Sequence, residues 1–132
     1  MPPALEEACR LWRLAHRDAA TFALLKPIPQ ASMAALGFHV QQAVEKALKA
    51  VCTMNGLEVR RTHDLAALAE SILDIGEALP LTVDEFRSLN PFAVDFRNDD
   101  EMQSSLSRQE LDFLLSRVIG WADSKFRQNS AG

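Results

Sequence analysis

The sequence lacks both the cysteine framework of a disulfide-stabilised protein and the long apolar run of a membrane protein. Its two cysteines, Cys9 and Cys52, lie inside apolar helical patterns, which favours reduced thiols in the cytoplasm. No apolar stretch approaches the roughly 18 residues that a membrane-spanning helix needs. The first ten residues are acidic, whereas an export signal begins with basic and apolar residues. We therefore expect a cytoplasmic protein that makes no membrane contact.

The common motifs for binding metals and phosphates are missing as well. The three histidines, His16, His39 and His63, are scattered, neither cysteine has a C-x-x-C partner, and no glycine-rich phosphate loop occurs. We therefore expect no metal and no cofactor. A net charge of −4 also argues against a general nucleic-acid binder, because such proteins gain affinity from many lysine and arginine contacts to phosphate.

The residues that are present fit one helical domain. The chain has 132 residues, 48% of them hydrophobic and 24% charged, which is typical of a globular protein. Apolar residues recur at steps of three and four, and no stretch shows the alternation of a strand. The pattern predicts an all-α, up-and-down bundle of four to five helices in a single domain, residues 1–132.

Capping residues and helix breakers mark where the helices start and stop. A first helix of about twenty residues follows Pro2 and stops before Pro27, and Ser32 caps a second helix that runs to about Met54. Either Thr62 or Asp64 starts a third. The capping-box sequences 82–85 and 107–110 open a short helix and the last helix. On the third helix the core-facing residues are expected to be Leu65, Leu68, Ile72 and Ile75.

The second helix has two chemically different faces. One is an ordinary core stripe made of Val40, Ala43, Val44, Ala47, Leu48 and Val51. The other carries Phe38, Gln42, Glu45 and Lys49, in which Glu45 and Lys49 have the spacing of an ion pair within a helix. His63 follows at the start of the next helix, where a capping role and a binding role are both open. His39 borders the core stripe and is expected to be structural.

Three blocks of this sequence resemble the HEPN domains, small all-helical proteins often encoded beside a minimal nucleotidyltransferase. Residues 38–50 are similar to the family's Gln-x-x-Glu-Lys-x-x-Lys helix, residues 62–65 to its Thr-His-Asp-Leu helix start, and residues 90–97 to the segment ending in Arg-Tyr-Pro-Asp. The resemblance covers roughly residues 5–126. It implies a bundle like the helical domain of kanamycin nucleotidyltransferase, a homodimer, and a polar groove for a nucleotide of the ATP or GTP class. The groove candidates carried over from the family are Gln42, Glu45, Lys49, His63 and Arg97.

The chain departs from the catalytic members of the family. Many HEPN proteins are metal-independent ribonucleases with an Arg-x(4–6)-His motif, but residues 98–103, which follow Arg97, contain no histidine and three acidic residues. The only match to that spacing is Arg10 with His16, on the first helix, where the family does not place its active site. The sequence therefore leans against an enzyme, and we name no catalytic residue.

Three functional hypotheses remain. The first is a non-catalytic nucleotide-binding module beside a nucleotidyltransferase in a toxin–antitoxin-like system, in which Lys49 and Arg97 meet phosphate, Gln42 meets a base or ribose, and Glu45 holds Lys49. The second is a ribonuclease toxin, for which His63 with Arg97 is the pair to test. The third is a structural partner protein whose polar groove binds nothing.

Overall fold

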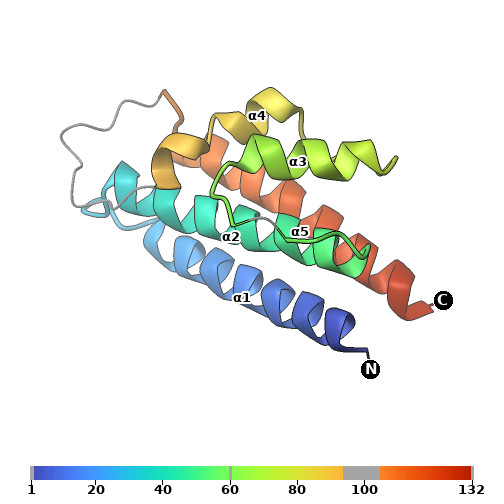
Figure 1. Cartoon of the computed structure of the whole chain (residues 1–132). Coiled ribbons are helices and arrows are strands. Elements are labelled where there is room, and N and C mark those ends of the chain that lie inside the picture. The colour runs from blue at the N-terminus through green and yellow to red at the C-terminus, as the bar shows by residue number, and fades with distance from the viewer. Residues whose placement is uncertain (1, 60, 94–104, 132) are drawn as a thin grey trace.

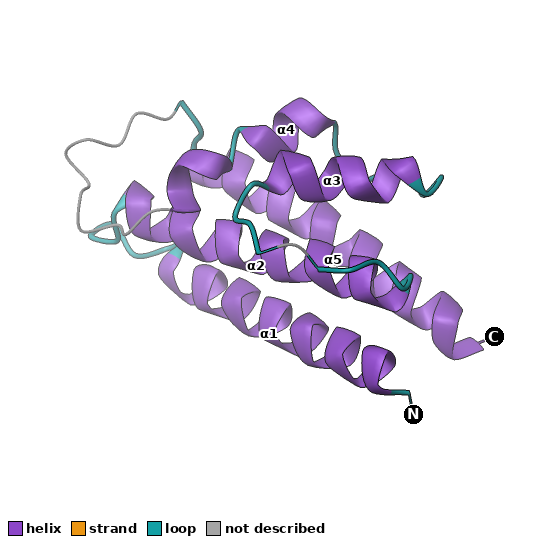
Figure 2. Ribbon diagram, in the orientation of Figure 1, coloured by secondary structure: helices purple, strands orange, loops and turns teal. Residues whose placement is uncertain are grey.

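The computed structural model describes residues 2–59, 61–93 and 105–131, and these residues form an all-α protein (Figure 1, Figure 2). They contain five α-helices and one short 3-10 helix, and no strand occurs among them. The predicted all-α bundle is therefore confirmed. The elements are α1 (Pro3–Leu25), α2 (Met33–Met54), α3 (Leu65–Asp74), α4 (Val83–Arg87), η1 (Asn90–Ala93) and α5 (Arg108–Ala131).

Helix α2 is central, and every other element except α4, which packs on α3, lies against it. α1, α3, α5 and η1 all contact α2, and in Figure 1 α1 lies on one side of it while α3 and α4 lie on the opposite side. The predicted core stripe of α2 is confirmed, because each of its residues is fully buried. These residues are Val40, Ala43, Val44, Ala47, Leu48 and Val51.

α1 and α2 are antiparallel, whereas α3 and α5 run in the same direction as α2 (Figure 1). α5 begins beside the end of α1, where Lys26 Nζ lies 2.5 Å from Asp112 Oδ2. α3 begins beside the middle of α2, where His63 meets Glu45. The start of α3 therefore lies against the polar face of α2.

Side-chain caps start the helices where the sequence predicts. The Ser32 hydroxyl accepts a hydrogen bond from the backbone amide three residues further on, at 3.0 Å. The cap of α3 is Asp64 rather than Thr62, since the Asp64 carboxylate accepts hydrogen bonds from the backbone amides of Ala66 and Ala67. Both capping boxes, 82–85 and 107–110, form with reciprocal hydrogen bonds.

One residue predicted for the core is not in it. α3 ends at Asp74, and Ile75 follows with a non-helical backbone (φ −93°, ψ 9°), ahead of Gly76 at φ +86°. Ile75 therefore leaves the helical stripe, and its side chain is 43% exposed. Leu65, Leu68 and Ile72, the other three predicted residues, are buried.

The start of α5 is bonded to the segment that joins α1 and α2, and η1 packs on α2. The Arg108 guanidinium donates to four backbone carbonyls in the range 26–31, at 2.6–3.3 Å. The ring of Phe92 lies directly on Gly37, where an added Cβ atom would come within 2.0 Å of Phe92 Cδ1. Glycine is required at this point because the backbone of α2 itself forms the surface on which the ring packs.

Candidate functional site

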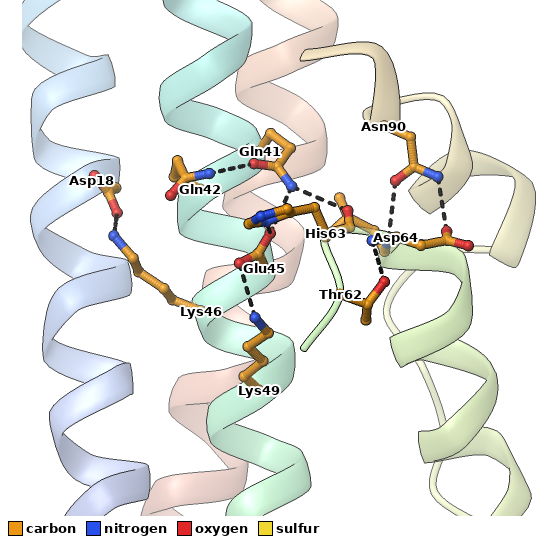
Figure 3. A network of polar contacts seen from close by, with 11 residues as sticks. Asp18, Gln41, Gln42, Glu45, Lys46, Lys49, Thr62, His63, Asp64 and Asn90 are labelled. Atoms are coloured by element: carbon orange, nitrogen blue, oxygen red, sulfur yellow. Dashed lines mark hydrogen bonds and ion pairs between the residues drawn. The ribbon is translucent and has the colours of Figure 1, made fainter. Parts of the chain in front are cut away.

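A single carboxylate, that of Glu45, organises the polar face of α2 (Figure 3). The residue is 5% exposed, and both of its carboxylate oxygens are hydrogen-bonded. Oε1 lies 2.8 Å from His63 Nδ1 and accepts from Gln41 Nε2 at 3.0 Å, while Oε2 accepts from Lys49 Nζ at 3.1 Å. Glu45 thus holds a lysine and a histidine side by side at the edge of the bundle.

His63 reaches this carboxylate because the start of α3 is fixed in place. Besides capping α3, Asp64 has its own backbone amide bonded to Thr62 Oγ1 at 3.0 Å. Asn90, at the start of η1, accepts from the Leu65 amide at 3.0 Å and donates to Asp64 Oδ1 at 2.9 Å (Figure 3). These bonds hold the backbone on the C-terminal side of His63, so its ring is directed at α2 although 70% of the side chain is exposed.

Gln41 is the residue of this network that sequence reasoning missed. Its side chain is fully buried, and its Nε2 donates to Glu45 and, at 3.4 Å, to the backbone carbonyl of His63. The Gln41 carbonyl oxygen in turn accepts from Gln42 Nε2 at 2.7 Å. Gln42, which we predicted as a site residue, therefore joins the network through Gln41, and Figure 3 shows no hydrogen bond from Gln42 to Glu45.

The hydrogen bonds determine the ionisation of Glu45. Burial alone raises the pKa of a carboxyl group. Here the bonds from Gln41, His63 and Lys49, together with the positive charge of Lys49, outweigh burial and hold the pKa of Glu45 below its ordinary value. Glu45 is consequently charged at neutral pH. The site then consists of a buried anion covered by a lysine ammonium that is 16% exposed and by an exposed imidazole.

The structure brings together four of the five predicted site residues. Gln42, Glu45, Lys49 and His63 lie in one network, whereas Arg97 lies outside the described residues. Whether these residues bind a ligand stays a prediction. His39, the expected structural histidine, has its Nδ1 atom buried without a hydrogen-bond partner among the described residues.

The Arg10–His16 spacing on α1 does not form a site. The Arg10 guanidinium binds Glu7 at 2.6 Å, in the direction of the N-terminus of the helix. His16 Nε2 lies 2.7 Å from Asp123 Oδ1 on α5, and the same oxygen accepts from Trp12 Nε1 at 2.7 Å. The two residues thus have different partners: Arg10 pairs within α1, whereas His16 joins α1 to α5.

Within residues 2–59, 61–93 and 105–131 there is no group of three or more histidine, cysteine, aspartate or glutamate side chains placed to hold a metal ion. In the same part of the chain, none of the helices combines the length and the apolar character needed to cross a membrane.

Comparison with known proteins gives one match. No curated protein and no solved structure matches the sequence or the fold significantly. The family model of the HEPN domain matches residues 25–120, which is most of the chain and contains the whole Glu45 network. The chain belongs to the HEPN domain family.

Proposed function

We propose that this HEPN protein is a non-catalytic nucleotide-binding module that acts as a homodimer beside a separately encoded minimal nucleotidyltransferase, in a toxin–antitoxin-like system. The observation that carries the proposal is the pair of nitrogen donors that Glu45 holds at the surface. A buried carboxylate bonded to both Lys49 and His63 fixes the two side chains relative to each other. Donors fixed in this way lose little conformational entropy when a phosphate group binds.

Within the part of the chain that the structure describes, both donors retain hydrogen-bonding capacity beyond their bonds to Glu45. A lysine ammonium has three N–H groups, and Glu45 uses one of those of Lys49. His63 contacts Glu45 through Nδ1, which leaves Nε2 on the exposed side of the ring. A phosphate oxygen can therefore meet both residues without displacing Glu45.

Gln42 and Arg97 complete the proposed recognition. Gln42 uses its amide nitrogen to reach Gln41, so its carbonyl oxygen is available to accept a hydrogen bond from a base or ribose. Arg97, which lies beyond the described residues, would supply a planar guanidinium for a second phosphate. No bond-breaking step is assigned to these groups, because the chain lacks the Arg-x(4–6)-His motif after Arg97.

One observation favours a second candidate, the metal-independent ribonuclease. A carboxylate that binds Nδ1 of an exposed histidine fixes the tautomer and orientation of the ring, as in enzymes that use histidine for general acid–base catalysis. His63 would then act with Arg97 on the 2′-hydroxyl of RNA. Cleavage of single-stranded RNA that disappears in His63→Ala but survives in His16→Ala would establish this activity in place of the binding role.

Titration calorimetry with ATP, GTP, AMP and GMP tests the proposal. We expect micromolar binding that Lys49→Met and Arg97→Ala each weaken by about tenfold, as for the loss of one charge-assisted hydrogen bond to phosphate. Lys46→Met is the matched control, since Lys46 lies on the same helix but pairs with Asp18 on α1 at 2.5 Å (Figure 3). No heat from any nucleotide with folded wild-type protein would reject nucleotide binding and favour the structural-partner hypothesis.

The proposed assembly has its own test. Sedimentation should show a dimer at micromolar concentration, and a minimal nucleotidyltransferase encoded beside the gene should co-purify with the tagged protein. A monomer that retains no such partner would refute the assembly while leaving the calorimetric result to stand on its own.

A further inference from the structure

A cleft between α4 and the first turns of α5 lies apart from the Glu45 network, and no step of the proposed function uses it. Its volume is 290 Å³, and it is lined by Glu85, Ser88, Leu106, Glu110, Phe113 and Leu114. The floor is apolar, since Leu114 is 5% exposed and Leu106 packs partly buried against the core. Phe113 forms one wall and is 57% exposed, a large fraction for an aromatic side chain in water.

The rim of the cleft is negatively charged. Glu85 and Glu110 both lie on it, one from α4 and one from α5. Each carboxylate bonds a capping-box amide through Oε1, at 2.9 and 3.0 Å, so its charge is held in a fixed position at the surface. The Arg117 guanidinium lies 5.7 Å from the centre of the Phe113 ring and donates to the Pro80 carbonyl. A positive charge therefore stacks on this ring, whereas the charged side chains that line the cleft itself are both carboxylates.

Size and charge together select one kind of occupant. A 290 Å³ cleft lies at the lower limit of pockets that enclose small molecules, but it accommodates one or two apolar side chains. A second copy of this chain docked by the same face would bring Glu85 and Glu110 against the same residues of its neighbour, and like charges across an interface are unfavourable. The occupant must therefore present apolar side chains flanked by positive charge.

We propose that the cleft between α4 and α5 is a docking site for a basic, apolar peptide segment of another protein, with Phe113 and Leu114 holding its apolar side chains and Glu85 and Glu110 pairing with its lysines or arginines. An exposed aromatic residue beside a small apolar pocket is the usual anchor of such interfaces. Fixed carboxylates at the rim select the sign of the partner and speed its association.

The test uses three fluorescein-labelled synthetic peptides and measures their binding by fluorescence anisotropy. The first places leucines on one helical face and lysines beside them, the second replaces the lysines by glutamates, and the third replaces the leucines by serines. Wild-type protein should bind the first peptide and bind the other two at least about tenfold more weakly, because the cleft requires both features. Binding of the acidic peptide as tightly as the basic one, or no binding of the basic peptide, would overturn the proposal.

Matched variants locate the binding. Phe113→Ser should weaken binding of the basic peptide by about tenfold, whereas Leu24→Ser, which removes an even more exposed apolar side chain on α1, should leave binding unchanged. Glu85→Gln with Glu110→Gln should weaken it similarly, and both capping boxes survive because glutamine also fits that motif. An equal loss in Leu24→Ser, or undiminished binding to Phe113→Ser, would place the peptide elsewhere and refute the assignment.

Discussion

Replacing Glu45 by glutamine is the sharpest test of the polar network, because it keeps the shape of the side chain and removes its charge. In Glu45→Gln the new NH₂ group faces nitrogen donors, and Lys49 loses the carboxylate 3.1 Å from its ammonium group. A hydrogen bond to a charged group contributes about 1.5–3 kcal/mol, and removing one member of a buried pair costs about 3–5 kcal/mol. Since Lys49 is 16% and His63 70% exposed, solvent offsets part of this loss. We expect the variant to lose about 2 kcal/mol of unfolding free energy at neutral pH.

The pH dependence of this loss follows from the lowered pKa of Glu45. A carboxyl whose pKa is lower in the folded than in the unfolded protein stabilises the fold above its unfolded pKa. That contribution disappears as the pH falls through the folded pKa, because the native carboxyl then takes up a proton. Below that pH, Glu45 carries no charge, and its charge no longer makes the wild type more stable than the glutamine variant.

Urea denaturation followed by circular dichroism, at neutral pH and at several acidic pH values, measures both effects. Glu70→Gln is the control: its side chain is 59% exposed and lies 4.0 Å from Arg87, so its loss should change stability by less than about 0.5 kcal/mol. The reasoning would be refuted by a Glu45→Gln cost below about 0.5 kcal/mol at neutral pH. A cost that stays constant into the acidic range would refute the electrostatic explanation specifically.

Two further predictions concern packing and thiol chemistry. Gly37→Ala should lower the unfolding free energy by about 1–3 kcal/mol, because the added Cβ would overlap the Phe92 ring. Gly120→Ala, whose added Cβ meets no atom within 4 Å, should raise the unfolding free energy by about 0.5–1 kcal/mol. Chemical denaturation of both variants measures the two changes, and equal effects would contradict the Phe92 contact. Cys52 is buried, and burial raises the pKa of its thiol to about 11. A thiol reagent at neutral pH should therefore label the partly exposed Cys9 first and Cys52 only on unfolding. Fast labelling of Cys52 in the folded protein, measured by peptide mass spectrometry, would contradict this prediction.

Local sequence predicted where the capped helices start. Ser32, Asp64 and the two capping boxes act within four residues of themselves, so their hydrogen bonds follow from short-range chemistry that any helix start offers. Ile75 shows where that approach fails. Its spacing fits the α3 stripe, but the helix ends one residue before it, and a spacing rule does not locate the final residue of a helix.

Helical periodicity predicted only the part of the site that lies on α2, and the family resemblance added His63. Gln42, Glu45 and Lys49 fall on one face of a helix that turns by about 100° per residue, so their spacing in the sequence predicted that they lie together. Gln41 lies between this face and the core stripe, where periodicity does not decide burial. It is fully buried, and its amide nitrogen lies 3.4 Å from the backbone carbonyl oxygen of His63, which precedes α3. Because Gln41 and His63 are 22 residues apart in the sequence, the local pattern of apolar and polar residues does not predict this contact.

The carboxylate that orders the site also limits how strongly the site can attract a phosphate. Glu45 is charged and cancels the charge of Lys49, so the network contributes oriented donors rather than net positive charge. Tight binding of a triphosphate would then depend on Arg97, because the charge of the γ-phosphate needs a cation that Glu45 does not neutralise. If nucleotide binding is found, the ratio of ATP to AMP affinity should therefore fall in Arg97→Ala and stay nearly constant in His63→Gln. An unchanged ratio in Arg97→Ala would mean that the Glu45 network alone accounts for phosphate recognition.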